Sequence, residues 1–162
     1  MIWKALTLTQ PWCGLVASGI KTVENRPRAM IRREDFHKPF ALHASRENSK
    51  EEMRRIIECA PDICADLTLP WFRLAAITSA IIGVATIREA LYIGGNSPET
   101  TRAMLEKIGI LDQERFVFGP TVYVLDDIRA LSEPIPCRGW QAFWTVPNET
   151  AVKIEDQLAR AA

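Results

Sequence analysis

The chain has 162 residues, of which 48% are hydrophobic and 25% charged, and this is the composition of one globular domain rather than of a disordered or fibrous chain. Basic and acidic residues balance at 20 each, so any polyanion must meet a local basic patch rather than an overall positive field. The longest apolar stretch, 74–85, is interrupted by polar residues and is shorter than the roughly 20 residues that span a bilayer. No secretory pattern opens the sequence, so we expect a cytoplasmic protein without membrane contact.

The cysteines and histidines argue against a disulfide framework and against a metal centre. Without a secretory signal, reduced thiols are expected at Cys13, Cys59, Cys64 and Cys137. Zinc ligands are usually paired two to four residues apart, and neither Cys59 with Cys64 nor His37 with His43 has such a spacing. We therefore predict no metal site and no cofactor.

The first elements are a strand, a short helix and a second strand. Residues 5–8 alternate between apolar and polar, which is typical of a strand. Pro11 suits the first turn of a helix, and Gly19 suits its left-handed end. Residues 22–26 then resume a strand, on which alternate side chains share one face.

A charged loop, two strands and a helix follow. Residues 27–39 are bounded by prolines and predict the loop, and residues 40–44 predict a short apolar strand. Ser49 and Glu52 have the spacing of a capping box, so a helix is expected to start there. Residues 81–87 predict a buried strand that contains a glycine.

The last third predicts two helices and two strands. Ser97 and Gly109 mark the start and the end of the first helix. Residues 121–125 and 141–146 predict strands, and residues 149–161 predict a terminal amphipathic helix. Because the strands and helices do not alternate regularly, we expect an α+β fold with a mixed sheet that curls toward a barrel.

The chemistry is densest between residues 10 and 26. Thr22, Glu24 and Arg26 are two apart and are predicted to share a strand face, with Lys21 leading into it. The region is also locally basic, with cations at Lys21, Arg26, Arg28, Arg32 and Arg33. By pattern alone, these residues fit a functional cleft and a solvated strand face equally well.

The stretch Gln10 to Arg26 closely resembles the signature of the ASCH domain, in which a helix with Q-P-W is followed by G-x-K-x-x-E-x-R. Residues 40–45, 80–87 and 134–144 also look like strands of that family. The resemblance implies a PUA-like fold, a curved mixed sheet or pseudo-barrel flanked by short helices, with a cleft beside the first helix. We accordingly assign residues 1–147 to the ASCH domain and residues 148–162 to a helical extension of it.

The resemblance implies a partner that is RNA or single-stranded nucleic acid, or a modified nucleoside. In this hypothesis Lys21 and Arg26 contact phosphate, and Glu24 orients Arg26 or accepts from a base edge. Trp12 stacks on a base, although a tryptophan on the inner face of a short helix is also typical of a core. The expected binding set further includes Arg28, Ser45 and Arg46.

A hydrolase is the alternative that the same resemblance leaves open, either an amidohydrolase that acts on acetylated cytidine or a ribonuclease. Lys21 would then need a depressed pKa, with Thr22 offering a hydroxyl and Glu24 moving a proton. The related amidohydrolases carry threonine where this chain has Glu24, so the match to them is incomplete. Glu89, expected just past the central strand, is the candidate for a further carboxylate.

Overall fold

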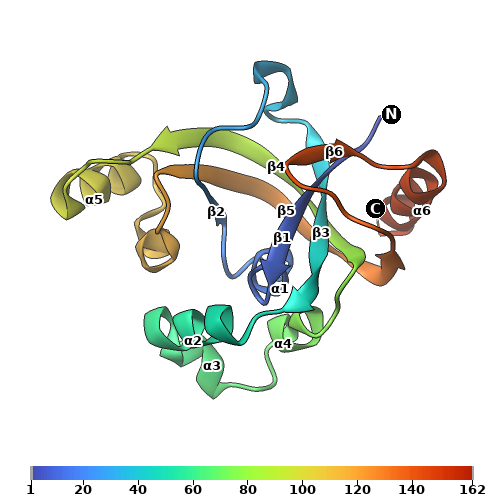
Figure 1. The fold of residues 1–162 in the computed structure, drawn as a ribbon, viewed down its shortest axis with the longest axis horizontal. Coiled ribbons are helices and arrows are strands. Elements are labelled where there is room, and N and C mark those ends of the chain that lie inside the picture. Colours follow the sequence, from blue (N-terminus) through green and yellow to red (C-terminus); the bar gives the residue numbers. More distant parts are fainter. Residues whose placement is uncertain (1, 162) are drawn as a thin grey trace.

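A six-stranded sheet with the order β2-β5-β4-β3-β1-β6 organises the computed structural model, which describes residues 2–161 (Figure 1). Its strands are β1 (Lys4–Gln10), β2 (Val23–Arg26), β3 (Pro39–Asn48), β4 (Ala80–Tyr92), β5 (Thr121–Pro136) and β6 (Phe143–Thr145). Strands β1 and β3 pair in parallel and the other neighbours pair antiparallel, so the sheet is mixed, as expected. Because β2 and β6 remain as edges, the curved sheet does not close, and the predicted pseudo-barrel is not confirmed.

The helices lie around this sheet, with α2, α3 and α4 gathered below α1 and with α5 and α6 at opposite ends of the molecule (Figure 1). Their bounds are α1 (Trp12–Ala17), α2 (Lys50–Cys59), α3 (Pro61–Ala65), α4 (Pro70–Ala75), α5 (Pro98–Lys107) and α6 (Asn148–Arg160), with 3₁₀ turns at Arg33–Asp35 and Leu111–Phe116. The predicted caps are confirmed, because the Ser49 hydroxyl accepts from the Glu52 N–H at 3.2 Å and Ser97 likewise caps α5.

The two longest strands extend well beyond their predicted ends. Strand β4 continues through a register shift between Ile87 and Glu89, and Glu89 pairs with Val124 inside the sheet. The expectation that Glu89 lies just past the strand is therefore wrong. A bulge lets a strand continue after its apolar pattern breaks, because the extra residue bends the strand without ending its pairing.

A close approach between α1 and α4 fixes where the first helix points. A Cβ atom on Gly14 would lie 2.6 Å from the main-chain nitrogen of Ala75, so only glycine allows this contact. Behind it, Trp71 of α4 is fully buried and its indole N–H donates to the Ile63 carbonyl at 3.2 Å. This packing sets the position of the segment that follows α1.

The C-terminal helix α6 packs against the sheet. Its Ala151 and Ile154 are buried in a cluster with Trp3 and Trp144. The Trp3 indole N–H donates to Glu155 at 3.0 Å, which links the residue before β1 to the helix. Within residues 2–161 the longest helices are too short and too polar to cross a membrane.

Candidate functional site

The turn between α1 and β2 directs Lys21 into the protein. Gly19 has a φ of 78°, a conformation that side chains disfavour, and its N–H donates to the Val16 carbonyl at 2.9 Å. Two residues later, the Lys21 N–H donates to the Leu15 carbonyl at 3.2 Å. The lysine side chain therefore enters directly beneath α1, where only 1% of the residue is exposed.

One carboxylate joins the two cations of the motif. The Nζ atom of Lys21 donates to the Val23 carbonyl and lies 3.2 Å from Oε2 of Glu24. The Nη2 atom of Arg26 lies 3.3 Å from the other oxygen of Glu24. Lys21 also lies 5.5 Å from the ring centre of Trp12, within the range of a cation–π contact. The three charged groups form a connected set, so the loss of one changes the balance of the other two.

These side chains line a cavity of about 400 Å³, which we call the Lys21 cavity. This volume lies within the range of small-ligand sites. The rings of Trp12 and Phe118 are 5.7 Å apart and form an aromatic wall, and the Trp12 indole donates to Glu52 at 2.5 Å. The basic lining residues are Lys21, Arg26 and Arg55, and the acidic ones are Glu24 and Glu52. Basic groups therefore exceed acidic groups by one.

Burial changes the protonation chemistry under α1. Desolvation lowers the pKa of Lys21 below its ordinary value of 10.5, while the Glu24 carboxylate opposes this change and Arg26 adds to it. Burial raises the pKa of the nearby Cys13 thiol far above its ordinary value of 9.0. Cys13 is thus a neutral core thiol rather than a nucleophile, whereas Lys21 can lose its proton more easily than a surface lysine.

Some of the predicted site residues line the Lys21 cavity and others lie outside it. Trp12, Lys21, Glu24 and Arg26 line the Lys21 cavity, but Thr22 and Arg28 do not. Thr22 lies before β2, which begins at Val23, and its N–H donates to the Gln113 side chain at 2.8 Å. Arg28 is exposed in the loop beyond the strand. Thr22, Glu24 and Arg26 were expected to share one strand face. Only Glu24 and Arg26 do so at the cavity, because Thr22 lies before the strand.

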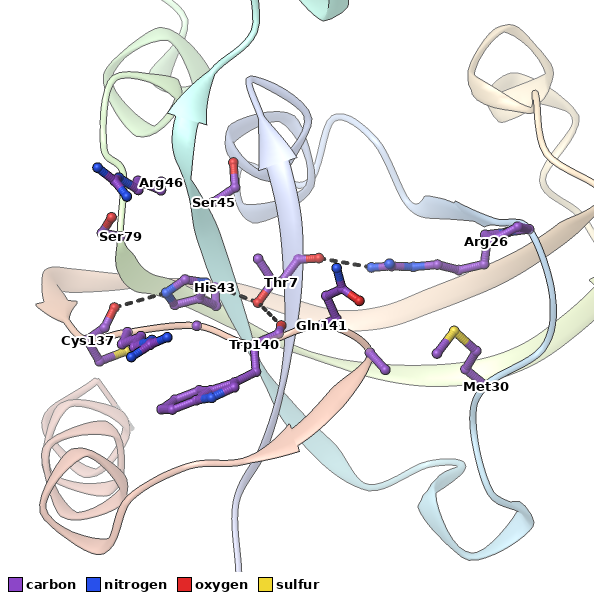
Figure 2. A pocket seen from close by; sticks show the side chains of 14 residues that line it. Thr7, Arg26, Met30, His43, Ser45, Arg46, Ser79, Cys137, Trp140 and Gln141 are labelled. Atoms are coloured by element: carbon purple, nitrogen blue, oxygen red, sulfur yellow. Dashed lines mark hydrogen bonds between the residues drawn. The ribbon is translucent and has the colours of Figure 1, made fainter.

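Ser45 and Arg46 line a second, larger cavity of about 960 Å³, which we call the Trp140 cavity (Figure 2). Thr7, Arg26 and Pro27 line both cavities, so the two adjoin. The sequence pattern does not single out the segment 137–142, which contributes Trp140, because residues 134–144 look like one closing strand. The available signal was the run Arg138-Gly139-Trp140, where glycine separates a cation from an aromatic ring.

Comparisons with known proteins identify the fold. No protein-family model matches the chain, and no curated protein matches it. The crystal structure of ASCH from Zymomonas mobilis has a TM-score of 0.53 and 15% identity, covering 94% of this chain and 93% of that chain. Two variants of that protein have TM-scores of 0.52 and 16% identity, covering 94% and 96% of this chain and 94% and 98% of theirs. This chain therefore has the ASCH-domain fold over nearly its whole length.

Proposed function

We propose that this protein binds RNA or another single-stranded nucleic acid through the Lys21 cavity. The observation that carries the proposal is the convergence of Lys21, Glu24 and Arg26 in one cavity with more basic than acidic side chains. Glu24 faces two cations with one negative charge, so a phosphate oxygen meets positive charge that is only partly balanced. The ASCH fold supports the proposal, because the resemblance to that family implies nucleic-acid binding.

We expect the two cations to have different roles in binding. Arg26 donates from Nη2 to the Thr7 carbonyl at 3.1 Å, and its buried Nε finds no acceptor among residues 2–161. Because Arg26 lines the cavity and its guanidinium carries further N–H donors, a phosphate oxygen can accept from it there. Lys21 is almost completely buried, and it contributes charge from beneath rather than direct contact. A base is expected to pack on Phe118, which is exposed at the cavity wall beside Trp12.

A salt titration tests this proposal. Binding of a labelled single-stranded RNA decamer should weaken as salt rises, with a log–log slope of about −0.7 for each phosphate contact. Arg26→Gln should reduce both the affinity and the slope, whereas Arg129→Gln on the exposed part of β5 should change neither. Absence of RNA binding by the wild type at about 25 mM salt would contradict the proposal.

A hydrolase is a second candidate, and one observation favours it. Burial lowers the pKa of Lys21, and its Nζ lies 3.2 Å from Glu24, so an amine and a carboxylate are placed to exchange a proton. Under this candidate the wild type cleaves acetylcytidine or single-stranded RNA, and Lys21→Met abolishes product formation while the far-UV circular dichroism spectrum stays unchanged. A wild type that leaves both substrates intact rules the candidate out.

A further inference from the structure

We infer that the Trp140 cavity binds the neighbouring base of the same strand, so that the ligand is an oligonucleotide that crosses Arg26 rather than a single nucleoside. The inference rests on the proposed function of the Lys21 cavity and names its substrate class. Three observations carry it: the two cavities share residues, Trp140 is held rigidly at the surface, and the larger cavity contains only positive charges among its charged side chains.

Arg26 stands at the boundary between the cavities. Figure 2 shows its guanidinium reaching toward the Thr7 carbonyl, 3.1 Å away, on strand β1. Both residues line both cavities, as does Pro27. In a single strand each phosphate lies between two nucleosides. A phosphate on Arg26 can therefore place one base in the Lys21 cavity and the next in the Trp140 cavity.

The backbone around Trp140 is anchored from two strands. The Thr7 hydroxyl donates to the Trp140 carbonyl at 2.7 Å, and Nε2 of His43 donates to the Cys137 carbonyl at 3.1 Å (Figure 2). Gly139 lies so close to His43 that an added Cβ would be 2.2 Å from the imidazole ring. This anchoring fixes the segment before any ligand arrives, so little conformational entropy is lost when a base stacks on Trp140.

The Trp140 ring is supported from within and remains available from outside. It packs against Trp144 with ring centres 5.1 Å apart, and the Arg138 guanidinium lies 5.7 Å from its centre. Even so, 48% of Trp140 is exposed. An aromatic platform with adjacent cations is the arrangement that binds single strands, because the ring stacks on a base while the cations hold phosphate.

The charges of the cavity favour an anionic ligand. Its lining contains three arginines, Arg26, Arg46 and Arg138, and no aspartate or glutamate. Neither Arg46 nor Arg138 forms an ion pair with any residue in 2–161. A neutral nucleoside would leave these cations unbalanced, whereas the phosphates of an oligonucleotide would meet them.

Calorimetric titration of adenosine monophosphate and of a tetra-adenylate RNA tests the inference. Trp140→Ala should weaken tetranucleotide binding about 5- to 100-fold and leave mononucleotide binding unchanged. Tyr92→Ala is the matched control, since Tyr92 is 70% exposed and lines neither cavity. Arg46→Gln, a surface change that leaves the aromatic packing intact, should lower the salt slope for the tetranucleotide by about 0.7.

The outcomes separate this inference from the proposed function. Equal tetranucleotide affinity in the wild type, Trp140→Ala and Arg46→Gln would overturn the inference while leaving the Lys21 cavity as a binding site. An equal loss of mononucleotide and tetranucleotide binding in Trp140→Ala would also overturn it, because the two cavities would then not act on one strand. Failure of the wild type to bind any oligonucleotide would overturn both.

Discussion

Lys21→Met is expected to weaken the binding of single-stranded RNA about tenfold, because it removes a buried positive charge that attracts phosphate through the low-dielectric protein. Methionine keeps the unbranched shape but removes the ammonium, so Arg26 alone must balance Glu24 and is held more firmly by it. The lining of the Lys21 cavity would then contain two basic and two acidic side chains instead of an excess of positive charge. Fluorescence anisotropy with a labelled decamer measures the change.

Lys50→Met is the matched control for this prediction, because Lys50 is exposed at the start of α2 and lines neither cavity. Its affinity should equal that of the wild type. If both variants bind RNA as tightly as the wild type, Lys21 has no part in binding and the assignment of the cavity is wrong.

The Lys21→Met substitution should also change how the stability of the protein depends on pH. Burial lowers the native pKa of Lys21, whereas the unfolded chain keeps the ordinary value of 10.5. Between these two values the unfolded state holds a proton that the native state has released, so the free energy of unfolding rises with pH. The stability of the wild type relative to Lys21→Met should thus increase as pH approaches 10.5 and stay constant above it. Urea unfolding across this range measures the difference, and a pH-independent difference would contradict the desolvation of Lys21.

Trp71→Ala is expected to have the largest effect on stability, a loss of about 3–5 kcal/mol in the free energy of unfolding. Trp71 is completely buried, and its ring lies 3.9 Å from that of Phe72 while its N–H donates to Ile63. Truncation would leave a large cavity under α4, the helix on which Gly14 of α1 rests. Equilibrium urea denaturation measures the loss.

The same substitution at Trp140 provides the comparison. Trp140→Ala removes a half-exposed ring and should cost less than about 1 kcal/mol, because surface changes leave no internal void. Equal losses of stability in Trp71→Ala and Trp140→Ala would contradict this prediction, because the buried Trp71 ring would then stabilise the fold no more than a half-exposed ring.

Local signals accounted for the elements that position the Lys21 cavity. Ser49 caps its helix through its own side chain, and Gly19 adopts the left-handed conformation that its place after α1 requires. Glu24 and Arg26 are two residues apart on one strand, so their proximity follows from strand geometry. Such features depend on neighbouring residues and can be read from a short stretch of sequence.

Features that depend on distant segments were missed or predicted incorrectly. Thr22 hydrogen-bonds to Gln113, 91 residues away, and β2 starts one residue later than its pattern indicates. The Trp140 cavity arises only because Thr7 and His43, from two other strands, hold the 137–142 segment in place. Barrel closure likewise depends on whether the two edge strands meet, and hydrophobic periodicity contains no information on that.

The most direct measurement of the central claim is a titration of the protein with tetra-adenylate RNA, followed through the indole N–H resonances in two-dimensional NMR spectra. Trp12 and Trp140 line the two cavities, whereas Trp71 of α4 is fully buried and Trp3 contacts α6. Binding should shift the Trp12 and Trp140 resonances and leave those of Trp71 and Trp3 in place. A Trp12 resonance that stays unchanged while RNA binds would contradict the assignment of the Lys21 cavity as the binding site.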